Sequence, residues 1–220
     1  VRMDTDNLTK KGELQEKINA FKNNEYDIML GTQMVAKGLN FPNLKLVGVI
    51  LADTALHLPD FRSAERTFSL ITQVAGRAGR FFPDGKVLVQ TYSPEREPIL
   101  FSVNNQTQKF YEMEINNRRM LNFPPFCRLV RLVFRAPTEK QAVEAAEGAS
   151  SILRNELYAI YSQKISPDFT QEQKNKVAST EILGPAECPL SKIAGSFRWQ
   201  LILKGQDITI LQKAASNLFY

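Results

Sequence analysis

A near-continuous apolar run at residues 46–52, Leu-Val-Gly-Val-Ile-Leu-Ala, constrains the fold of this chain more than any other segment. The run contains no charged residue, has the length of a strand and is too short to cross a membrane as a helix. Such a pattern is typical of a strand that is buried on both faces of a parallel sheet. The sequence therefore predicts an α/β layer.

The segments around this run alternate between helical and extended patterns, as in α/β proteins. Residues 9–24 predict an amphipathic helix, because Leu14, Ile18 and Phe21 follow helical spacing and Thr9 can serve as the N-cap. We further expect a strand over 26–30, a helix over 61–78 and a strand over 86–92.

The pattern changes beyond residue 92, where prolines interrupt the chain. Residues 99–122 predict a connecting helical segment that ends at Pro124 and Pro125. The rest predicts a smaller α+β domain in the order β-α-β-β-α. Its first two elements are a strand over 128–134 and a helix over 139–160. The inner face of this helix is expected to consist of Ala142, Ala145, Ala146, Ala149 and Leu153. A polar loop over 162–179 leads to strands over 180–183 and 197–204 and to a last helix over 208–219. We place the domains at 1–111 and 112–220.

The amino-acid composition argues against several classes of protein. The chain has 220 residues with 43% hydrophobic residues, enough for a packed core in one or two domains. Two cysteines and one histidine argue against a disulfide scaffold and against a histidine or four-cysteine metal centre. Cys127, Cys188 and His57 are expected to be ordinary residues. The net charge of +5 is shared almost evenly by the two domains and hints only weakly at a polyanionic partner.

The eight residues 73–80, Gln-Val-Ala-Gly-Arg-Ala-Gly-Arg, carry the strongest chemical signal. Arg77 and Arg80 lie three positions apart on one side of a helical turn, and each guanidinium offers a planar fork of donors to phosphate oxygens. The two glycines would let a ligand approach the backbone. Alternatively, the arginines only complement the helix dipole and the glycines end the helix. The complete string after a βα unit favours phosphate chemistry.

A second polar segment, 31–42, reads Gly-Thr-Gln-Met-Val-Ala-Lys-Gly-Leu-Asn-Phe-Pro. It follows the carboxyl end of an expected strand, where open α/β sheets place their ligands. Thr32 and Gln33 offer short polar groups, and Lys37 offers a charge for a phosphate. Taken alone, the segment could equally be an ordinary strand-to-helix turn.

Together with Asp-Phe-Arg-Ser-Ala-Glu-Arg at 60–66, these two strings resemble motifs V and VI of superfamily-2 helicases. Their wording is similar to that of the primosomal replication-restart helicases. The resemblance continues through Asn-Arg-Arg-Met-Leu-Asn-Phe-Pro-Pro at 117–125, Ile-Leu-Gly-Pro-Ala at 182–186 and Phe-Arg-Trp-Gln-Leu-Ile-Leu-Lys at 197–204, and so covers nearly the whole chain.

This resemblance implies a partial second RecA-like lobe followed by an α+β C-terminal domain. The implied activity is an ATP-dependent 3′-to-5′ DNA helicase that recognises stalled or branched forks and starts primosome assembly. Carried over by motif, Arg77 and Arg80 would face the γ-phosphate of ATP from the second lobe, with support from Gln73 and Gly76.

The same resemblance assigns roles to the second segment. Gly38 and Asn40 would lie on the nucleotide side of the cleft, whereas Thr32, Gln33 and Lys37 would approach the DNA backbone. Asn40 departs from the family pattern, in which Asp is common. An asparagine keeps the acceptor oxygen but loses the charge.

The resemblance also implies partners and a location in the bacterial cytoplasm, with no membrane partner. The partners would be forked DNA, single-stranded-DNA-binding protein and other primosome proteins, with Arg198 and Gln200 as candidate contacts for a partner's carboxylate or peptide tail. The alternatives are a DNA- and protein-binding adaptor without catalysis, or another superfamily-2 translocase that acts on branched DNA.

No Gly-x-x-x-x-Gly-Lys-[Ser/Thr] loop occurs in the sequence, and no Asp-Glu-x-His motif occurs either. The family's zinc sites need more cysteines than these two. We therefore expect a fragment that is inactive alone and holds no metal. The resemblance implies ATP and Mg²⁺ as cofactors of the full-length protein, with zinc held elsewhere in that protein.

Overall fold

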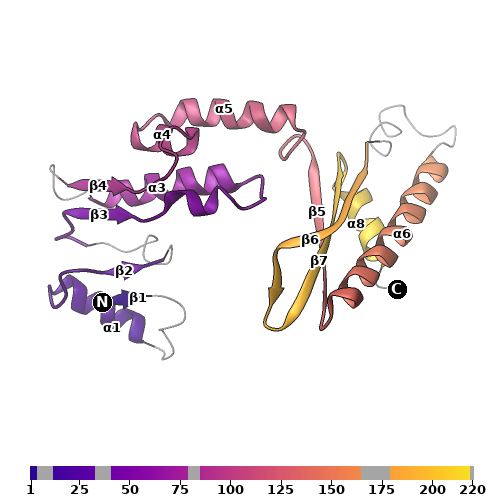
Figure 1. Cartoon of the computed structure of the whole chain (residues 1–220). Helices are drawn as coiled ribbons and strands as arrows, with labels where there is room; N and C mark the ends of the chain where they lie inside the picture. The colour runs from indigo at the N-terminus through magenta and orange to yellow at the C-terminus, as the bar shows by residue number, and fades with distance from the viewer. Residues whose placement is uncertain (4–11, 33–40, 79–84, 165–178, 219–220) are drawn as a thin grey trace. The chain divides into compact units, whose positions relative to one another are not determined.

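The structure is a computed structural model that describes residues 1–3, 12–32, 41–78, 85–164 and 179–218, with only the backbone described at Arg77, Ala78, Tyr161, Gln163 and Lys164. The chain divides into two compact units, Val1–Glu114 and Ile115–Tyr220 (Figure 1). We describe each unit by itself. Unit 1 contains parallel strand pairs with helices, and unit 2 contains an antiparallel sheet with helices.

Two short parallel pairs form the sheets of unit 1. Strand β1 (Arg2–Met3) pairs with β2 (Leu30–Gly31), and β3 (Leu46–Val49) pairs with β4 (Lys86–Val89). The parallel pairing confirms the expected α/β layer. The strands expected over 26–30, 46–52 and 86–92 are shorter in the structure, because their ladders extend over only a few residues.

Helix α1 (Glu13–Lys22) covers the first strand pair. Its buried Ile18 packs with Met3 and Phe41, and Leu14 and Phe21 pack against this cluster. The helix begins after Gly12, whose φ of 100° lies in the left-handed region. The expectation that Thr9 caps this helix is therefore wrong, since the left-handed turn at Gly12 sets the boundary.

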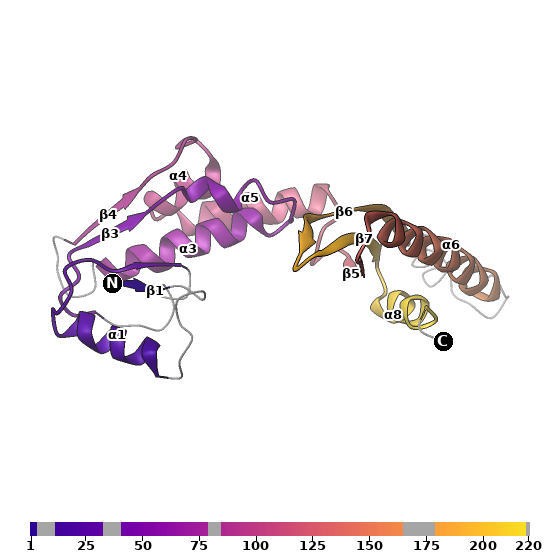
Figure 2. The same cartoon turned by 60° about the horizontal axis from the view of Figure 1, so that its bottom comes forward.

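One face of the β3–β4 pair is covered by helix α3 (Ser63–Ala78), as Figure 2 shows. Ile71 of this helix packs with Ala52 and Ile99, and Val49 and Val89 lie against that cluster. On the opposite face Leu46 remains 54% exposed. The expectation that this strand is buried on both faces is thus wrong for the described residues, because only one face carries a helix.

Beyond β4, the expected connecting segment consists of two helices, α4 (Glu97–Val103) and α5 (Thr107–Met120). The buried ring of Phe110 on α5 stacks on Phe68 of α3, with 4.1 Å between ring centroids. This contact fixes the first part of α5 within unit 1.

Unit 2 is built on an antiparallel sheet in the order β5-β7-β6. Its strands are β5 (Arg128–Ala136), β6 (Glu181–Ile193) and β7 (Ser196–Gly205). Strand β6 is much longer than the expected strand over 180–183, and it pairs with β7 through two register shifts. Its prolines argue against a strand in the sequence, but an edge strand tolerates proline.

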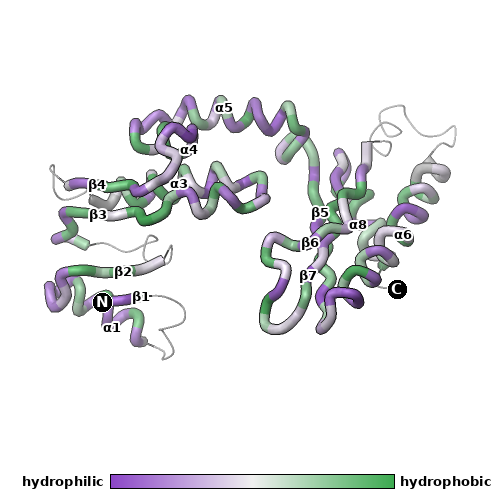
Figure 3. The backbone as a smooth tube through the Cα atoms, in the orientation of Figure 1, coloured by the Kyte–Doolittle hydropathy of each residue, from purple (hydrophilic) through white to green (hydrophobic). Residues whose placement is uncertain are grey.

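Two helices, α6 (Glu139–Lys164) and α8 (Ile208–Ser216), pack on one face of this sheet. Their core includes Leu153, Leu201 and Leu211, each with no exposed surface. Three of the four alanines expected on the inner face of α6 are buried, but Ala145 is exposed, because it lies at the edge of the stripe that faces the sheet. Figure 3 shows both polar and apolar residues along β5, and Val130, Leu132 and Phe134 of this strand pack against the core.

Candidate functional site

The start of helix α3 is fixed by Asp60. One carboxylate oxygen of Asp60 accepts a hydrogen bond from the Arg62 amide at 2.9 Å, and the other forms an ion pair with Arg66 at 2.8 Å. The Ser63 hydroxyl donates to the Leu58 carbonyl at 2.8 Å. The string at 60–66 therefore determines where α3 begins and in which direction the helix leaves the preceding turn.

The far end of α3 presents the phosphate-binding candidates. Thr67, Phe68, Ile71 and Val74 are buried along the inner side of the helix. Because α3 is anchored on that side, Gln73 and Gly76 are exposed on the other. Arg77 lies in the last turn of the helix, where its side chain is outside the description, and Arg80 lies outside the described residues.

The parallel pairing of β3 and β4 sets the direction of α3. Helix α3 connects two parallel strands, so it runs back along them and ends near the amino end of β4 (Figures 1 and 2). The exposed face of Gln73 and Gly76 therefore opens toward the amino edge of this strand pair, about 15–20 Å along the helix from its start.

The structure describes only part of the second candidate segment, residues 31–42. Thr32 is exposed directly after β2, which is the position that the sequence predicted for it. Gln33, Lys37, Gly38 and Asn40 lie outside the described residues. The DNA-backbone and nucleotide roles of this segment therefore stay predictions.

Asp53 is a buried carboxylate that the sequence analysis missed. It accepts hydrogen bonds from the Thr91 hydroxyl at 2.7 Å and from the Tyr92 amide at 2.8 Å. The Thr91 and Tyr92 hydrogen bonds hold the pKa of Asp53 below its ordinary value, against the opposing effect of burial. Asp53 thus joins the carboxyl ends of β3 and β4. The position of an acidic residue directly after the apolar run at 46–52 was the sequence signal that could have identified Asp53.

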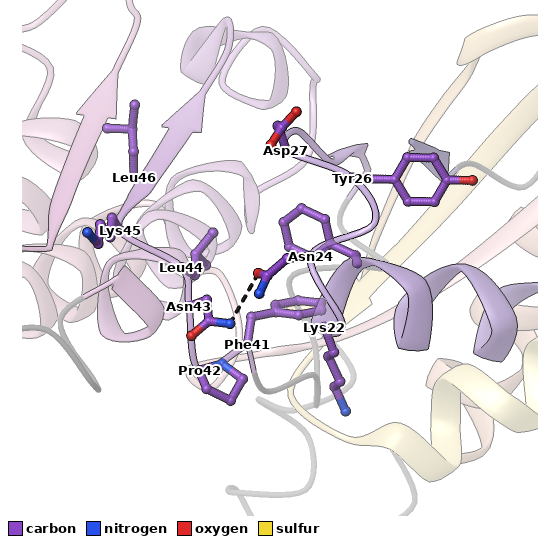
Figure 4. Close-up of a pocket in the computed structure, with 11 residues that line it drawn as sticks. Lys22, Asn24, Tyr26, Asp27, Phe41, Pro42, Asn43, Leu44, Lys45 and Leu46 are labelled. Carbon is purple, nitrogen blue, oxygen red and sulfur yellow. Dashed lines mark hydrogen bonds between the residues drawn. The ribbon is translucent and has the colours of Figure 1, made fainter.

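A cavity of about 300 Å³ lies between the end of α1 and residues 41–46 (Figure 4). The Asn43 amide donates to the Asn24 side-chain oxygen at 3.1 Å and closes one side of it. The side chains of Lys22, Tyr26 and Lys45 point in different directions (Figure 4). Because its polar groups do not converge on one point, we assign no ligand to this cavity.

In unit 2, Arg198 and Gln200 lie on the sheet face opposite α6 and α8. Arg198 donates to the Leu190 carbonyl at 3.2 Å, and Gln200 donates to the Glu187 carbonyl at 3.2 Å. Both side chains therefore support the irregular part of the β6–β7 hairpin. Their proposed contact with a partner stays a prediction.

This same outer face carries two further cations, on strand β5. Arg131 and Arg135 of β5 are exposed on it, and Arg135 lies directly opposite Arg198 in the strand register. Like charges at directly opposed positions repel each other. Among the described residues, we find no carboxylate that forms an ion pair with Arg131, Arg135 or Arg198. The face can therefore attract an anion.

The remaining candidates show ordinary surroundings. His57 is exposed, while Cys127 and Cys188 are buried. Burial raises the pKa of the Cys127 thiol, which disfavours its reactive thiolate form. The described residues contain no group of three or more His, Cys, Asp or Glu side chains that could hold a metal ion. Within the same residues, every helix is too short or too polar to span a membrane.

Comparison with known proteins covers both units. The helicase conserved C-terminal domain family matches residues 3–82, and the primosomal protein N C-terminal domain family matches residues 119–219. The helicase C-terminal domain is a RecA-like lobe, which confirms the fold class expected for the first part of the chain.

Several curated relatives align along nearly all of the chain. Replication restart protein PriA of Treponema pallidum is 40% identical over 98% of this chain, and that of Bacillus subtilis is 39% identical over 96%. PriA of Borreliella burgdorferi is 37% identical over 98%. The aligned region is 30%, 24% and 30% of these three relatives, so the chain spans less than a third of their length. The two family matches and these alignments show that this chain is similar, along nearly all of its own length, to the PriA family of replication restart proteins.

Proposed function

We propose that this chain supplies part of the second motor lobe and the C-terminal domain of an ATP-dependent 3′-to-5′ DNA helicase that restarts replication at stalled or branched forks. The observation that carries the proposal is the end of α3, where Gln73 and Gly76 are exposed within the motif VI string. The PriA relatives support the replication restart part of the proposal by their names.

In this proposal, Arg77 and Arg80 stabilise the charge that develops on the γ-phosphate during hydrolysis. Gln73 and Gly76 support the turn from which the arginines extend. Asp60 and Arg66 act through the helix, because they fix its start and hence the position of its far end. Thr32, Gln33 and Lys37 approach the DNA backbone, and Gly38 and Asn40 lie near the nucleotide.

ATP, Mg²⁺ and zinc belong in this proposal to the full-length protein. The described residues offer no group of acidic, His or Cys side chains suited to a metal ion, so we assign no metal ligand to them. This chain's own contribution is therefore to position cationic and polar groups against a nucleotide that the first lobe binds.

Replacement of Arg77 tests the catalytic part. In the full-length protein, Arg77→Ala should lower the ATP turnover rate by about 10³-fold or more, the scale of an arginine finger. DNA affinity should be largely unchanged, because the arginine contacts the nucleotide. The matched control is Arg154→Ala, which removes an exposed arginine from α6 of unit 2. An unchanged turnover rate in the Arg77 variant would remove Arg77 from its assigned role.

The arginines of unit 2 favour a second candidate function, that of a DNA- and protein-binding adaptor. Arg131, Arg135 and Arg198 lie on one open sheet face with a like-charge pair and no carboxylate partner among the described residues. Phosphates of DNA, or the acidic tail of single-stranded-DNA-binding protein held by Arg198 and Gln200, would neutralise this face.

Salt dependence separates these possibilities. If Arg131 and Arg135 contact phosphates, each substitution to Ala should reduce the slope of log affinity against log salt by about 1 for forked DNA. ATP turnover at saturating DNA should stay unchanged. Unaltered DNA binding, together with a lost affinity for an acidic peptide, would instead assign the face to a protein partner.

A further inference from the structure

The face of the β3–β4 pair that no described helix covers carries large apolar side chains that are exposed. Leu46 and Leu88 on this face are 54% and 61% exposed, and Ile50, which continues the alternation beyond β3, is 72% exposed. The strand register places Leu88 directly opposite Gly48. Three large apolar side chains thus surround a position that has no side chain.

Gly48 makes this face suited to close packing. A Cβ atom added at Gly48 would meet nothing within 4 Å, so the space above it is open. A glycine inside a strand often marks a place where another segment approaches the backbone closely. Because its φ is not in the left-handed region, backbone conformation does not require glycine at this position. The open space above Gly48 would let a neighbouring segment pack closely against the strand.

The opposite face shows what such packing achieves. There Val49 and Val89 lie against a cluster that contains Ile71 of α3. Parallel sheets are almost always covered on both faces, since their crossover helices lie on both sides. The β3–β4 pair is parallel, and among the described residues it has a helix on one side only. The missing cover is therefore expected to be helical, with an apolar stripe of its own.

We propose that the face formed by Leu46, Gly48, Ile50 and Leu88 docks an amphipathic helix from the part of the full-length protein that lies outside these 220 residues. The length of the relatives supports this occupant, because this region is only 24–30% of the three relatives described above. The proposal concerns the assembly of the lobe and does not depend on the helicase activity.

Thiol labelling of Leu88→Cys tests the proposal. Both native cysteines of the chain are buried, at 2% and 4% exposure, so the new thiol dominates labelling of the 220-residue chain. Peptide mapping by mass spectrometry follows the same position in the full-length protein. The control is Lys140→Cys on α6, whose native side chain is 86% exposed.

Relative to the control, Leu88→Cys should label at least tenfold more slowly in the full-length protein than in the 220-residue chain. A photo-crosslinker attached at this cysteine should join it to a segment outside the 220 residues. Equal relative rates in the two proteins would overturn the proposal. A different result would assign the face to a second copy of the chain. In that case the Leu88→Cys thiol of the 220-residue chain would label more slowly as the protein concentration rises, and the full-length protein would protect this thiol no more strongly.

A stability measurement keeps the proposal testable if crosslinking is inefficient. Leu88→Gln should lower the melting temperature of unit 1 in the full-length protein by several degrees, because it places an amide in an apolar interface. The same substitution should leave the melting temperature of the 220-residue chain nearly unchanged, since the side chain is exposed there. A melting temperature that is unchanged in both proteins would contradict a buried interface.

Discussion

The sheets of the two units have opposite patterns on their outer faces. In unit 1, the outer face of β3–β4 is mostly apolar, with Leu46, Ile50 and Leu88 exposed. In unit 2, the outer face of β5–β7 alternates apolar positions with Arg131 and Arg135. Each sheet nevertheless has helices on only one face among the described residues.

The difference between the two sheets indicates which open face is suited to contact with water. An antiparallel sheet commonly has one solvated face, and charged side chains there cost little. A parallel sheet is normally covered on both sides, so an apolar outer face indicates a missing neighbour. This contrast is the basis for proposing that the outer face of unit 2 binds an anionic partner and that the outer face of unit 1 packs against a helix.

The largest expected effect tests whether the two units unfold separately. Phe110→Ala should destabilise unit 1 by about 3–5 kcal/mol, because it removes a fully buried ring stacked on Phe68. The single tryptophan, Trp199, lies on β7 in unit 2, so its fluorescence reports only that unit. Circular dichroism during denaturation should show the lower stability of unit 1, while the Trp199 transition stays in place.

One result would contradict this independence. A shift of the Trp199 transition that equals the shift in circular dichroism would show one cooperative unit. The matched control is Tyr111→Ala, which removes a neighbouring ring that is 55% exposed and should cost about 1 kcal/mol or less.

A pH-dependent effect is expected in unit 1 from Asp53. Because hydrogen bonds lower its folded-state pKa, the ionised Asp53 stabilises the fold above the ordinary Asp pKa, and this contribution is lost as pH falls through the lowered value. Asp53→Asn removes it. Near neutral pH, the melting temperature of the variant should therefore be lower than that of the unchanged protein by a constant amount. This difference should shrink in strong acid. A deficit that grows as pH falls would contradict the assignment.

The smallest effect concerns the like-charge pair of unit 2. Arg135→Thr should stabilise the sheet by about 0.2–1 kcal/mol at low salt, since it removes the repulsion with Arg198. The gain should decrease with added salt, which screens exposed charges. Arg128→Thr is the matched control, because Arg128 lies opposite Gly205, which has no side chain. Equal effects of the two substitutions would mean that repulsion between Arg135 and Arg198 does not destabilise the sheet.

Much of the fold was predictable from the sequence, with the largest errors at boundaries and edges. The helix expected over 61–78 is observed as Ser63–Ala78, because the Asp60 turn delays its start by two residues. Strand β6 was missed over most of its length, since its prolines suggest a loop and only edge pairing with β7 makes it a strand.

The candidate site was predictable as a set of residues but not as a geometry. The motif strings identified Gln73, Gly76 and Arg77, and the structure shows that the first two are exposed near the end of α3. Asp53 was missed because its partners, Thr91 and Tyr92, are far away in the sequence. A contact between distant segments leaves no local pattern.

The sequence alone determined the element types, the parallel character of the first region and the motif strings, because local periodicity and spacing encode them. The tertiary structure decided which faces are covered. The apolar run at 46–52 indicates burial on both faces, but burial depends on which segments pack there. One face has α3 over it, and the other still exposes Leu46, because the covering of a sheet is a property of its neighbours and not of its own residues.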